Sequence, residues 1–500
     1  MFKIKKGDNM GNSIWKKNIR QLENDKIDEK NIDVLIIGGG LSGISTAFEL
    51  RNSNLNICLI ESNNIGSGAT SLTTGKVTYL QNTIYTDLEK VHNFDISKKY
   101  LESQLYASKI LKDNIKKYNI NCDYIQNDSY IFSYKQEDKY KIDGEYNILK
   151  KMNIKSQIVN KLPIQFPCNY ALKVSDTAVF NPVKYINSLI DIIKNKVKIY
   201  EHVRALKLTK ENGYYIVNTT SGNIKAKYVV VSTQYPFFVI PGLIPFKTHI
   251  EKSHVVASKI PKTKTFNAIS IGKQTYSIRY YNDKEPYIIF AGESYKMSNH
   301  IDYEQRQKEL EIKFKELFNL NPEYRWSIHD ITSNDLLPII GEVSDNLIVS
   351  TAFNKWGMTN SILSGKIISD IILKNDNKYI SLFNPKRKIT IKRTINFVVD
   401  TFSAGKIFLL TKLNKNKSFY NDKVKFVNIG GKSYGIYIDN KKNKHIVRNL
   451  CPHMKCSLVF NFMDKTWDCP CHGSRYDIDG NVIKGPSSFD IKVDNKNNIN

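Results

Sequence analysis

Long hydrophobic runs are absent from this sequence of 500 residues. A transmembrane helix needs about 20 mostly apolar residues, and the nearest approach, residues 228–246, is interrupted by one glutamine and three prolines. The N-terminus is polar and charged through Lys30, without the apolar segment or small-residue cleavage site of a secretory signal. From these absences we expect no transmembrane helix and a cytoplasmic protein.

Acidic residues are also in short supply, because 48 Asp and Glu stand against 74 Lys and Arg, giving a formal net charge of +26. Such a charge can indicate binding to nucleic acid or to a membrane surface. The lysines are spread along the chain, with no arginine-rich or aromatic-interleaved cluster, so we interpret them as solvated and expect no nucleic acid partner. A hydrophobic content of 41% indicates a globular protein, and its length allows two to four compact domains.

Cysteine is scarce and unevenly placed. Only seven are present, and four of them lie between residues 451 and 471. Cys58, Cys122 and Cys168 are isolated, which is typical of small buried hydrophobic residues. This usage suits a reducing compartment, and it directs attention to the four clustered cysteines.

A strand, a glycine turn, a helix, a second strand and an acid follow one another between residues 33 and 61. The apolar run 33–37 leads into Gly38-Gly39-Gly40-Leu41-Ser42-Gly43, and a second apolar run ends at Glu61. Gly38 permits a tight turn, Gly40 lets the backbone approach a pyrophosphate, and Gly43 permits close helix–strand packing. Glu61 is placed to accept a hydrogen bond from a ribose hydroxyl. This order predicts a dinucleotide-binding unit.

The residues after this acid favour FAD over NAD. Small and hydroxyl residues fill 66–71 and 73–78, among them Ser67, Thr70 and Thr74. They can bring backbone amides against a pyrophosphate and a flavin ring, although an ordinary flexible loop would have the same composition. The run resembles the glycine oxidase and D-amino-acid dehydrogenase (DAO) superfamily of flavoproteins, in which the equivalent segment lines FAD.

Three later segments carry the same resemblance. It implies that the strand near Val203 packs its backbone against adenine, and that the turn at Gly357, Met358 and Thr359 offers amides to the flavin pyrimidine edge. A simple strand–helix cap is the alternative for that turn. Arg279 lies in a pattern of alternating polar and apolar residues that predicts an antiparallel sheet over 253–294. In amino-acid-oxidising relatives a similar arginine binds the substrate carboxylate; a surface ion pair is the alternative.

Cysteine and histidine occur together at two places near the C-terminus. Cys451 precedes His453 by two residues, and Cys469 precedes His472 by three. Two thiolates and two imidazoles suit a [2Fe-2S] cluster, with the thiolates on one iron and the imidazoles on the other. Zinc accepts the same four ligands, but a zinc site would leave the two further cysteines, one in each loop, unexplained.

Residues 420–495 resemble the Rieske iron–sulfur domain. The resemblance assigns the two cysteines and two histidines above to iron, and it pairs Cys456 with Cys471 in a disulfide. It also makes the hydroxyls of Ser474 and Tyr476 hydrogen-bond donors to cluster sulfur.

These donors lead to an expectation about the reduction potential. By the resemblance, Ser474 donates to a bridging sulfide and Tyr476 donates to the thiolate of Cys469. Donors to sulfur stabilise the extra electron of the reduced cluster. We therefore expect a potential in the upper part of the Rieske range, which suits a cluster that accepts electrons from reduced FAD.

The two cofactors together predict a converter between two-electron and one-electron chemistry, with the acceptor held at high effective concentration. The resemblance implies that an amine or amino acid reduces FAD, and that His453 or His472 hands single electrons to a quinone or a carrier protein. Two alternatives stay open: a reductase whose electrons enter at the cluster, and a non-enzymatic redox sensor or electron-transfer protein. An enzyme should have a cavity beside the flavin with converging polar groups, Arg279 among them.

We expect an α/β FAD-binding domain of Rossmann type, an α+β substrate domain and a small all-β Rieske domain. The expected parts are an N-terminal extension (1–30), the oxidoreductase (31–380), a linker (381–419) and the Rieske domain (420–500). Within the oxidoreductase, nucleotide-binding segments are expected at 31–80, 175–240 and 330–380, and substrate segments at 81–174 and 241–329. The stretch 395–410 predicts a linking helix, and contact of this region with a membrane surface is a minority interpretation.

Overall fold

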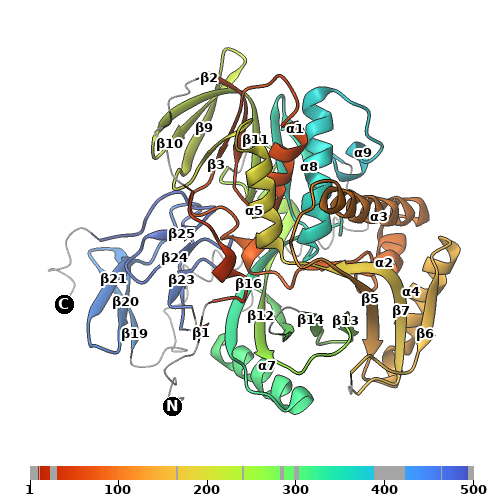
Figure 1. Cartoon of the computed structure of the whole chain (residues 1–500). Helices are drawn as coiled ribbons and strands as arrows, with labels where there is room; N and C mark the ends of the chain where they lie inside the picture. Colours follow the sequence, from red (N-terminus) through yellow and green to blue (C-terminus); the bar gives the residue numbers. More distant parts are fainter. Residues whose placement is uncertain are drawn as a thin grey trace.

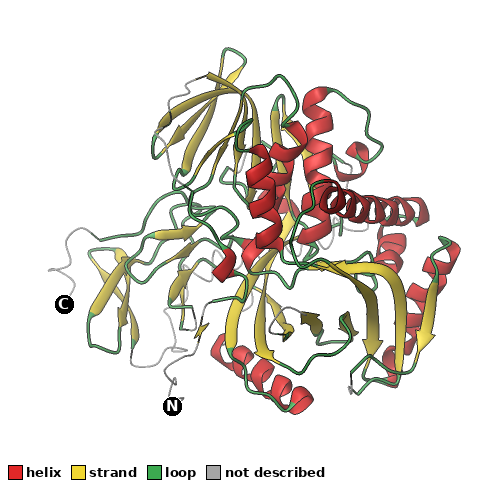
Figure 2. Ribbon diagram, viewed as in Figure 1, coloured by secondary structure: helices red, strands yellow, loops and turns green. Residues whose placement is uncertain are grey.

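The computed structural model describes residues 9–10, 12–22, 27, 31–164, 167–238, 241–281, 286–297, 303–387, 423–462 and 464–493. Two large sheets with their helices form the body of the protein, and two small sheets lie beside it at the C-terminal end of the chain (Figure 1, Figure 2). The linking helix predicted over 395–410 lies outside the described residues, as does most of the predicted linker.

The first large sheet contains the dinucleotide-binding unit. Its strands β18, β11, β2, β3 and β8 are parallel neighbours, β17 adds an antiparallel edge, and the hairpin β9–β10 continues from β11. In spatial order the strands are β17 (Ile339–Ser344), β18 (Leu347–Thr351), β11 (Gly222–Gln234), β2 (Asn31–Ile37), β3 (Ile57–Ile60) and β8 (Lys198–Tyr200), with β9 (Ala205–Glu211) and β10 (Tyr214–Thr219) at the side.

The apolar run of β2 is explained by burial on both faces of this sheet. Val34 and Ile36 point into the core that contains the helices, whereas Leu35 and Ile37 point into a second core on the opposite face. Since successive side chains of a strand alternate between faces, a strand covered on both sides needs apolar residues at every position. The sequence prediction of a buried strand here is confirmed.

Helices α1, α5 and α8 cover one face of the first sheet, and α3 crosses α8 (Figure 1). A Cβ added to Gly365 of α8 would lie 2.6 Å from the backbone of Ser45, so α1 and α8 are in close contact. The bounds are α1 (Leu41–Leu50), α3 (Phe94–Lys117), α5 (Pro182–Ile193) and α8 (Gly357–Leu373).

The second large sheet belongs to the predicted substrate domain. The antiparallel arrangement predicted for 253–294 is confirmed in β12, β15, β14 and β13, and β13 also pairs in parallel with β5. In order the strands are β1 (Asn9–Met10), β16 (Tyr324–Ser333), β12 (Thr248–Lys259), β15 (Tyr287–Lys296), β14 (Ser277–Tyr281), β13 (Phe266–Ile271), β5 (Ile125–Ser133), β7 (Tyr170–Val179) and β4 (Lys76–Val77), with β6 (Ser156–Val159) beside β7.

Shorter helices surround this sheet and its connections. Helix α7 packs on β12 and β15, and α4 packs near β5 to β7. The bounds are α2 (Ile84–Val91), α4 (Lys139–Lys151), α6 (Ile244–Lys247), α7 (Tyr303–Phe318), α9 (Ile380–Phe383), and the 3₁₀ turns η1 (Lys16–Asn18), η2 (Ala69–Ser71) and η3 (Gln136–Asp138). None of the helices within the described ranges is long and apolar enough to cross a membrane.

Two small antiparallel sheets form the C-terminal part (Figure 1). Trp467 is fully buried between them, and a Cβ on Gly435 would lie 2.6 Å from its ring. Cys451, Cys456 and Cys469 belong to the same core. The strands are β19 (Val424–Ile429), β20 (Lys432–Ile438) and β21 (Lys444–Arg448) in one sheet, and β22 (Val459–Asn461), β23 (Thr466–Asp468), β24 (Arg475–Tyr476) and β25 (Val482–Lys484) in the other.

Candidate functional site

A cavity of about 860 Å³ is lined by residues of both large sheets. Most of the residues predicted to bind FAD meet at its wall, although they are spread over more than three hundred positions of the chain. The predicted residues that line it are Gly38, Gly40, Glu61, Ser67, Thr70, Thr74, Val203, Gly357 and Met358. The tertiary structure therefore brings the dinucleotide motif, the hydroxyl-rich run and the turn before α8 to one place.

The glycine turn between β2 and α1 fits a pyrophosphate. Gly38 has φ +111°, and an added Cβ would lie 2.6 Å from the carbonyl oxygen of Ser232. A Cβ on Gly43 would lie 2.0 Å from the Gly38 oxygen, so this glycine serves the packing that the sequence predicts. A Cβ on Gly40 would meet only the Thr70 hydroxyl, at 3.5 Å. Packing therefore leaves room at Gly40, where a phosphate can approach the N-terminus of α1.

The carboxylate of Glu61 is fixed at the cavity wall. It accepts hydrogen bonds from the backbone N–H of Gly39 at 2.7 Å and of Asn63 at 2.9 Å. The N–H of Val203 donates to the Glu61 carbonyl at 2.8 Å, which joins the predicted ribose and adenine residues. Recognition of the ribose by Glu61 stays a prediction.

Thr359 does not line the cavity. Its buried hydroxyl donates to Gln104 of α3 at 2.6 Å, so its side chain joins α8 to α3. Gly357 and Met358, two residues and one residue earlier, do line the cavity. The difference follows from the helical turn, since consecutive side chains at the start of a helix point in different directions.

Arg279 lies behind the cavity wall rather than in it. Its side chain is fully buried, and its guanidinium donates to the backbone oxygens of Thr74 and Phe180. The ring of Trp15 lies 4.9 Å from the guanidinium carbon, and this tryptophan is itself fully buried. Arg279 is not among the cavity-lining residues. This geometry favours a structural role, and the predicted binding of a substrate carboxylate stays a prediction that these contacts do not support.

Lys76 is a cavity-lining residue that sequence reasoning missed. Its ammonium nitrogen lies 3.0 Å from the carbonyl oxygen of Ala268 and 2.6 Å from the hydroxyl of Ser277. Burial, together with the positive charge of Arg279, holds the pKa of Lys76 well below its usual value. The sequence offers one indication of this residue. Lys76 is the only lysine or arginine in the run of small and hydroxyl residues between 66 and 78.

The four predicted iron ligands lie together in the C-terminal part. The rings of His453 and His472 are 4.9 Å apart, and the thiol of Cys469 is within hydrogen-bonding reach of Cys451. Burial lowers the pKa of His453 to about 4 and of His472 to about 3, so both imidazoles are neutral at pH 7, the form that binds a metal. Both ring nitrogens of His453 and one of His472 have no hydrogen-bond partner among the described residues. This donor set fits a [2Fe-2S] cluster.

The two ligand loops are joined as the resemblance implies. Cys456 and Cys471 form a disulfide. The sulfur atoms of both lie within 4.8 Å of Cys469. The covalent bond therefore holds the loop of His453 against the loop of His472.

The position of Tyr476 corrects one expectation. The sequence predicts that its hydroxyl donates to Cys469, but the structure places it 3.3 Å from the sulfur of Cys451. Arg475 and Tyr476 are neighbours on β24, so they point to opposite faces of their sheet. Because Arg475 faces the body, Tyr476 enters the core and reaches the first ligand loop. Ser474 accepts a hydrogen bond from the N–H of Ser487 at 2.9 Å, and its donation to the cluster stays a prediction.

The two histidines face the body formed by the two large sheets. The ring of Tyr235 lies 5.6 Å from that of His472 and 6.4 Å from that of His453. Tyr235 follows β11 directly and lines the cavity. A Cβ on Gly473 would lie 2.9 Å from Ile250 of β12, so the second ligand loop also touches the second sheet. One buried residue thus contacts both the cavity and the histidine side of the cluster site.

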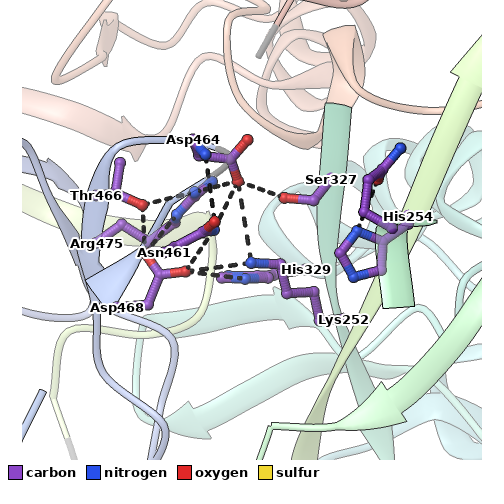
Figure 3. Close-up of polar contacts among 10 residues, drawn as sticks. Lys252, His254, Ser327, His329, Asn461, Asp464, Thr466, Asp468 and Arg475 are labelled. Carbon is purple, nitrogen blue, oxygen red and sulfur yellow. Dashed lines mark hydrogen bonds and ion pairs between the residues drawn. The ribbon is translucent and has the colours of Figure 1, made fainter. Parts of the chain in front are cut away.

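A buried ionic cluster holds the C-terminal part to the second sheet (Figure 3). Lys252 of β12, with 1% of its side chain exposed, lies 3.3 Å from Asp468 and 3.9 Å from Asp464. Arg475 lies 2.6 Å from Asp464 and 3.0 Å from Asp468, and the hydroxyl of Ser327 donates to Asp464 at 2.6 Å. Lys252 is thus the cation that the second sheet supplies, and Arg475 and both carboxylates belong to the C-terminal part.

The carboxylates of this cluster stay ionised. Burial alone would raise the pKa of Asp464, but the charges of Arg475 and Lys252 outweigh it and hold that pKa well below its usual range. The pKa of Asp468 is lowered by the same two cations against the effect of burial. Removing one partner from a buried ion pair costs about 3–5 kcal/mol, so this contact fixes the position of the C-terminal part.

Two family matches cover the two parts of the chain. The FAD dependent oxidoreductase family matches residues 33–371, and the Rieske [2Fe-2S] domain matches residues 410–493. The second match decides between iron–sulfur cluster and zinc in favour of the cluster.

Known proteins resemble the chain over much of its length. The Rieske 2Fe-2S iron-sulfur protein YhfW of Bacillus subtilis is 30% identical over 485 residues, which are 93% of this chain and 94% of that protein. Gamma-glutamylputrescine oxidoreductase of Escherichia coli is 20% identical over 372 residues, 70% of this chain and 86% of that protein. The structure of glycine oxidase from Geobacillus kaustophilus aligns with a TM-score of 0.61 at 16% identity, over 72% of this chain and 100% of the other. The predicted fold class is confirmed.

Proposed function

Because this chain belongs to the FAD dependent oxidoreductase family and carries a Rieske [2Fe-2S] domain, we propose that it oxidises an amine or an amino acid and passes the electrons singly to a quinone or a carrier protein. The observation that carries the proposal is a single cavity that extends from the glycine turn to the strands of the second sheet and to Tyr235. The names of the relatives, which include an amine and an amino acid oxidoreductase, support the substrate class.

The two cofactors and the protein each supply a different part of the proposed chemistry. Bound FAD supplies a two-electron acceptor for the substrate carbon–nitrogen bond, and the [2Fe-2S] cluster takes electrons one at a time. The protein supplies orientation, exclusion of water and proton transfer.

Lys76 is our candidate for the proton acceptor at the substrate end. A lysine whose pKa is depressed by burial is a neutral amine at lower pH than a free lysine, so it can take a proton from a substrate ammonium group. The lysine nitrogen is held by Ala268 and Ser277 on neighbouring strands of the second sheet. Lys355, ion-paired with Glu251 at 2.6 Å, is a second cation of the cavity wall.

Tyr235 is our candidate for the contact through which electrons reach the cluster. In a Rieske site the histidines bind one iron and the cysteines bind the other. Here the two predicted histidine ligands pack on Tyr235. This placement supports electron entry at the histidines from the flavin side, in contrast to the expectation that they serve as the exit. The reductase alternative uses the same contact in reverse, so the relative potentials of the cofactors distinguish the two.

The test is anaerobic mixing of the holoenzyme with a panel of amines and amino acids. The flavin absorbance and the electron paramagnetic resonance signal of the reduced cluster are followed together. We expect one member of the panel to bleach the flavin and the cluster signal to follow without any added carrier. A flavin that no amine bleaches, with a cluster potential below the flavin potential, would overturn the proposal and favour the reductase.

A further inference from the structure

We propose that the Rieske domain is also a wall of the FAD site: residues 482–488 close the nucleotide end of the cavity and retain FAD. This role does not depend on the substrate or on the direction of electron flow. It gives the Rieske domain a second task, in addition to electron transfer, that neither family resemblance supplies.

Three hydrogen bonds join this segment to the nucleotide-binding sheet. The side-chain amide of Asn63 donates to the carbonyl oxygen of Ile483 at 3.2 Å, and the guanidinium of Arg204 donates to that of Val482 at 3.0 Å. In the reverse direction, the hydroxyl of Ser488 donates to the Ala205 oxygen at 3.1 Å. All three bonds cross between parts of the chain that are far apart in sequence.

The partners on the nucleotide side belong to the predicted adenosine end. Asn63 comes two residues after Glu61, and Arg204 comes directly after Val203. Glu61 and Val203 are the residues expected at the ribose and the adenine, and both line the cavity. The segment 482–488 is therefore attached where the adenosine part of FAD is expected to lie.

The same segment forms part of the cavity surface. Residues 483–488 line the cavity, together with Gly38 and Glu61 on the other side. A segment that only touched the outside of the nucleotide domain would not share this surface. FAD that occupies the predicted site is thus enclosed between the two domains.

The segment is also held firmly on its own domain. The N–H of Val482 donates to Asp490 at 2.9 Å, and the N–H of Ser487 donates to the hydroxyl of Ser474 in the second ligand loop at 2.9 Å. On another side of the domain, the cluster of Lys252 and Asp464 fixes the Rieske domain to the second sheet. The segment cannot move away from the nucleotide end without breaking buried ion pairs or its own anchors.

The main experiment measures release of FAD from the holoenzyme. Wild type and an Asn63→Ala/Arg204→Ala double variant are diluted, and the rise in fluorescence of free FAD gives the dissociation rate. We expect release to be about tenfold faster in the double variant, the size expected from two lost hydrogen bonds. Iron content and the cluster resonance signal should be unchanged, which shows that the Rieske domain is still folded.

Arg20→Ala is the matched control, because Arg20 forms an exposed ion pair with Asp191 at 2.8 Å and does not line the cavity. Its FAD release should equal that of wild type. A second route to the same result is Asp464→Asn, which weakens the contact with the second sheet and should also speed release.

Unchanged release in both the double variant and Asp464→Asn, with iron retained, would overturn the proposal. Equal acceleration in Arg20→Ala would overturn it too, because the effect would then be unspecific. Should the double variant not fold, Ser488→Ala decides, since it removes one hydroxyl only: faster release supports the wall and an unchanged rate contradicts it.

Discussion

The FAD cavity and the iron–sulfur site of this protein are built in opposite ways. The cavity draws on segments from residue 16 to residue 488, and glycines 38 and 40 belong to its wall. The iron–sulfur site is expected to use four side chains between residues 451 and 472, each of which would supply one donor atom. The first site depends on the path of the chain and the second on the identity of four residues.

This difference predicts different responses to substitution. A cluster ligand has no substitute, so its loss removes the metal centre. A residue of the cavity wall shares its task with many others, so most single substitutions there should be tolerated. Two kinds of position should not tolerate substitution. One is a glycine at which an added Cβ would collide with backbone, and the other is a side chain that acts directly on the substrate.

The largest effect is expected for a ligand substitution. Cys469→Ala should abolish the cluster, because a thiolate ligand to iron cannot be replaced by a methyl group. Thr70→Ala, at the cavity wall, should retain one FAD per chain. Its free energy of unfolding should fall by only about 1 kcal/mol, because the Leu41 N–H loses the Thr70 hydroxyl as its acceptor. Iron analysis and flavin absorbance measure the two outcomes, and an intact cluster in Cys469→Ala would remove the basis of the comparison.

Gly43, in the glycine turn between β2 and α1, is expected to tolerate no larger side chain. In Gly43→Ala the new Cβ would lie 2.0 Å from the Gly38 oxygen, and such overpacking costs about 3 kcal/mol or more of the free energy of unfolding. Gly40→Ala is the matched control, since its Cβ would lie 3.5 Å from the nearest atom, the Thr70 hydroxyl oxygen. This variant should keep the fold and weaken FAD binding alone. Thermal unfolding with and without FAD separates the two effects, and equal stability of the variants would contradict the geometry.

Lys76→Met is expected to slow flavin reduction by about 100-fold, the usual contribution of a general base. The lysine acts as a neutral amine, so wild-type reduction should fall as pH falls through its pKa, which burial and Arg279 hold well below the ordinary value. The variant should lack this dependence on pH while its FAD content stays the same. A pH profile that is identical in both proteins would exclude Lys76 as the base.

Arg279→Met separates the structural from the substrate-binding interpretation. Loss of the guanidinium leaves the backbone oxygens of Thr74 and Phe180 without donors, which costs about 1–3 kcal/mol for each buried group left unpaired. It also removes a positive charge near Lys76, so the acid side of the pH profile should move to higher pH. If KM for a carboxylate substrate rises instead and the profile does not move, the prediction from sequence is correct.

The smallest effect is expected for Tyr476→Phe. Its hydroxyl lies 3.3 Å from the sulfur of Cys451, and a donor to a ligand sulfur stabilises the reduced cluster. The variant should keep its iron and have a lower reduction potential. Tyr437→Phe, a buried tyrosine of the same core that stacks on Phe460, is the control and should leave the potential unchanged. Equal potentials in wild type and Tyr476→Phe would show that the contact has no electronic effect.

The local parts of the protein could be read from the sequence. The requirement for glycine at position 43 is local, because a Cβ there would meet the Gly38 oxygen five residues earlier in the same turn. Gly38 differs, since its Cβ would meet Ser232 of the distant strand β11. The four predicted iron ligands and the disulfide lie in two short loops, so their spacing in the chain limits their spacing in space. The antiparallel strands of the second sheet are indicated by the alternation of polar and apolar residues along the sequence.

The position of a side chain relative to distant elements could not be read in this way. Arg279 and Ser277 are two residues apart on β14, and alternation alone places both on the same face of the sheet. Only the packing of Trp15 and Thr74 shows that the arginine is enclosed, while Lys76 and Ser277 line the cavity. The hydroxyl of Tyr476 was misplaced by the same kind of omission, since its partner comes from the other ligand loop. The amide contact predicted for Thr359 stays a prediction.

The sequence by itself determined which cofactors the protein binds, because the glycine turn and the Cys/His set are local patterns whose chemistry depends on a few adjacent residues. The tertiary structure alone decided how the two sites meet. Tyr235 contacts the histidines, Asp464 pairs with Lys252, and Arg204 holds the Rieske segment over the nucleotide end. Each of these contacts joins residues more than 200 positions apart, and no local propensity records which distant surfaces fold against each other.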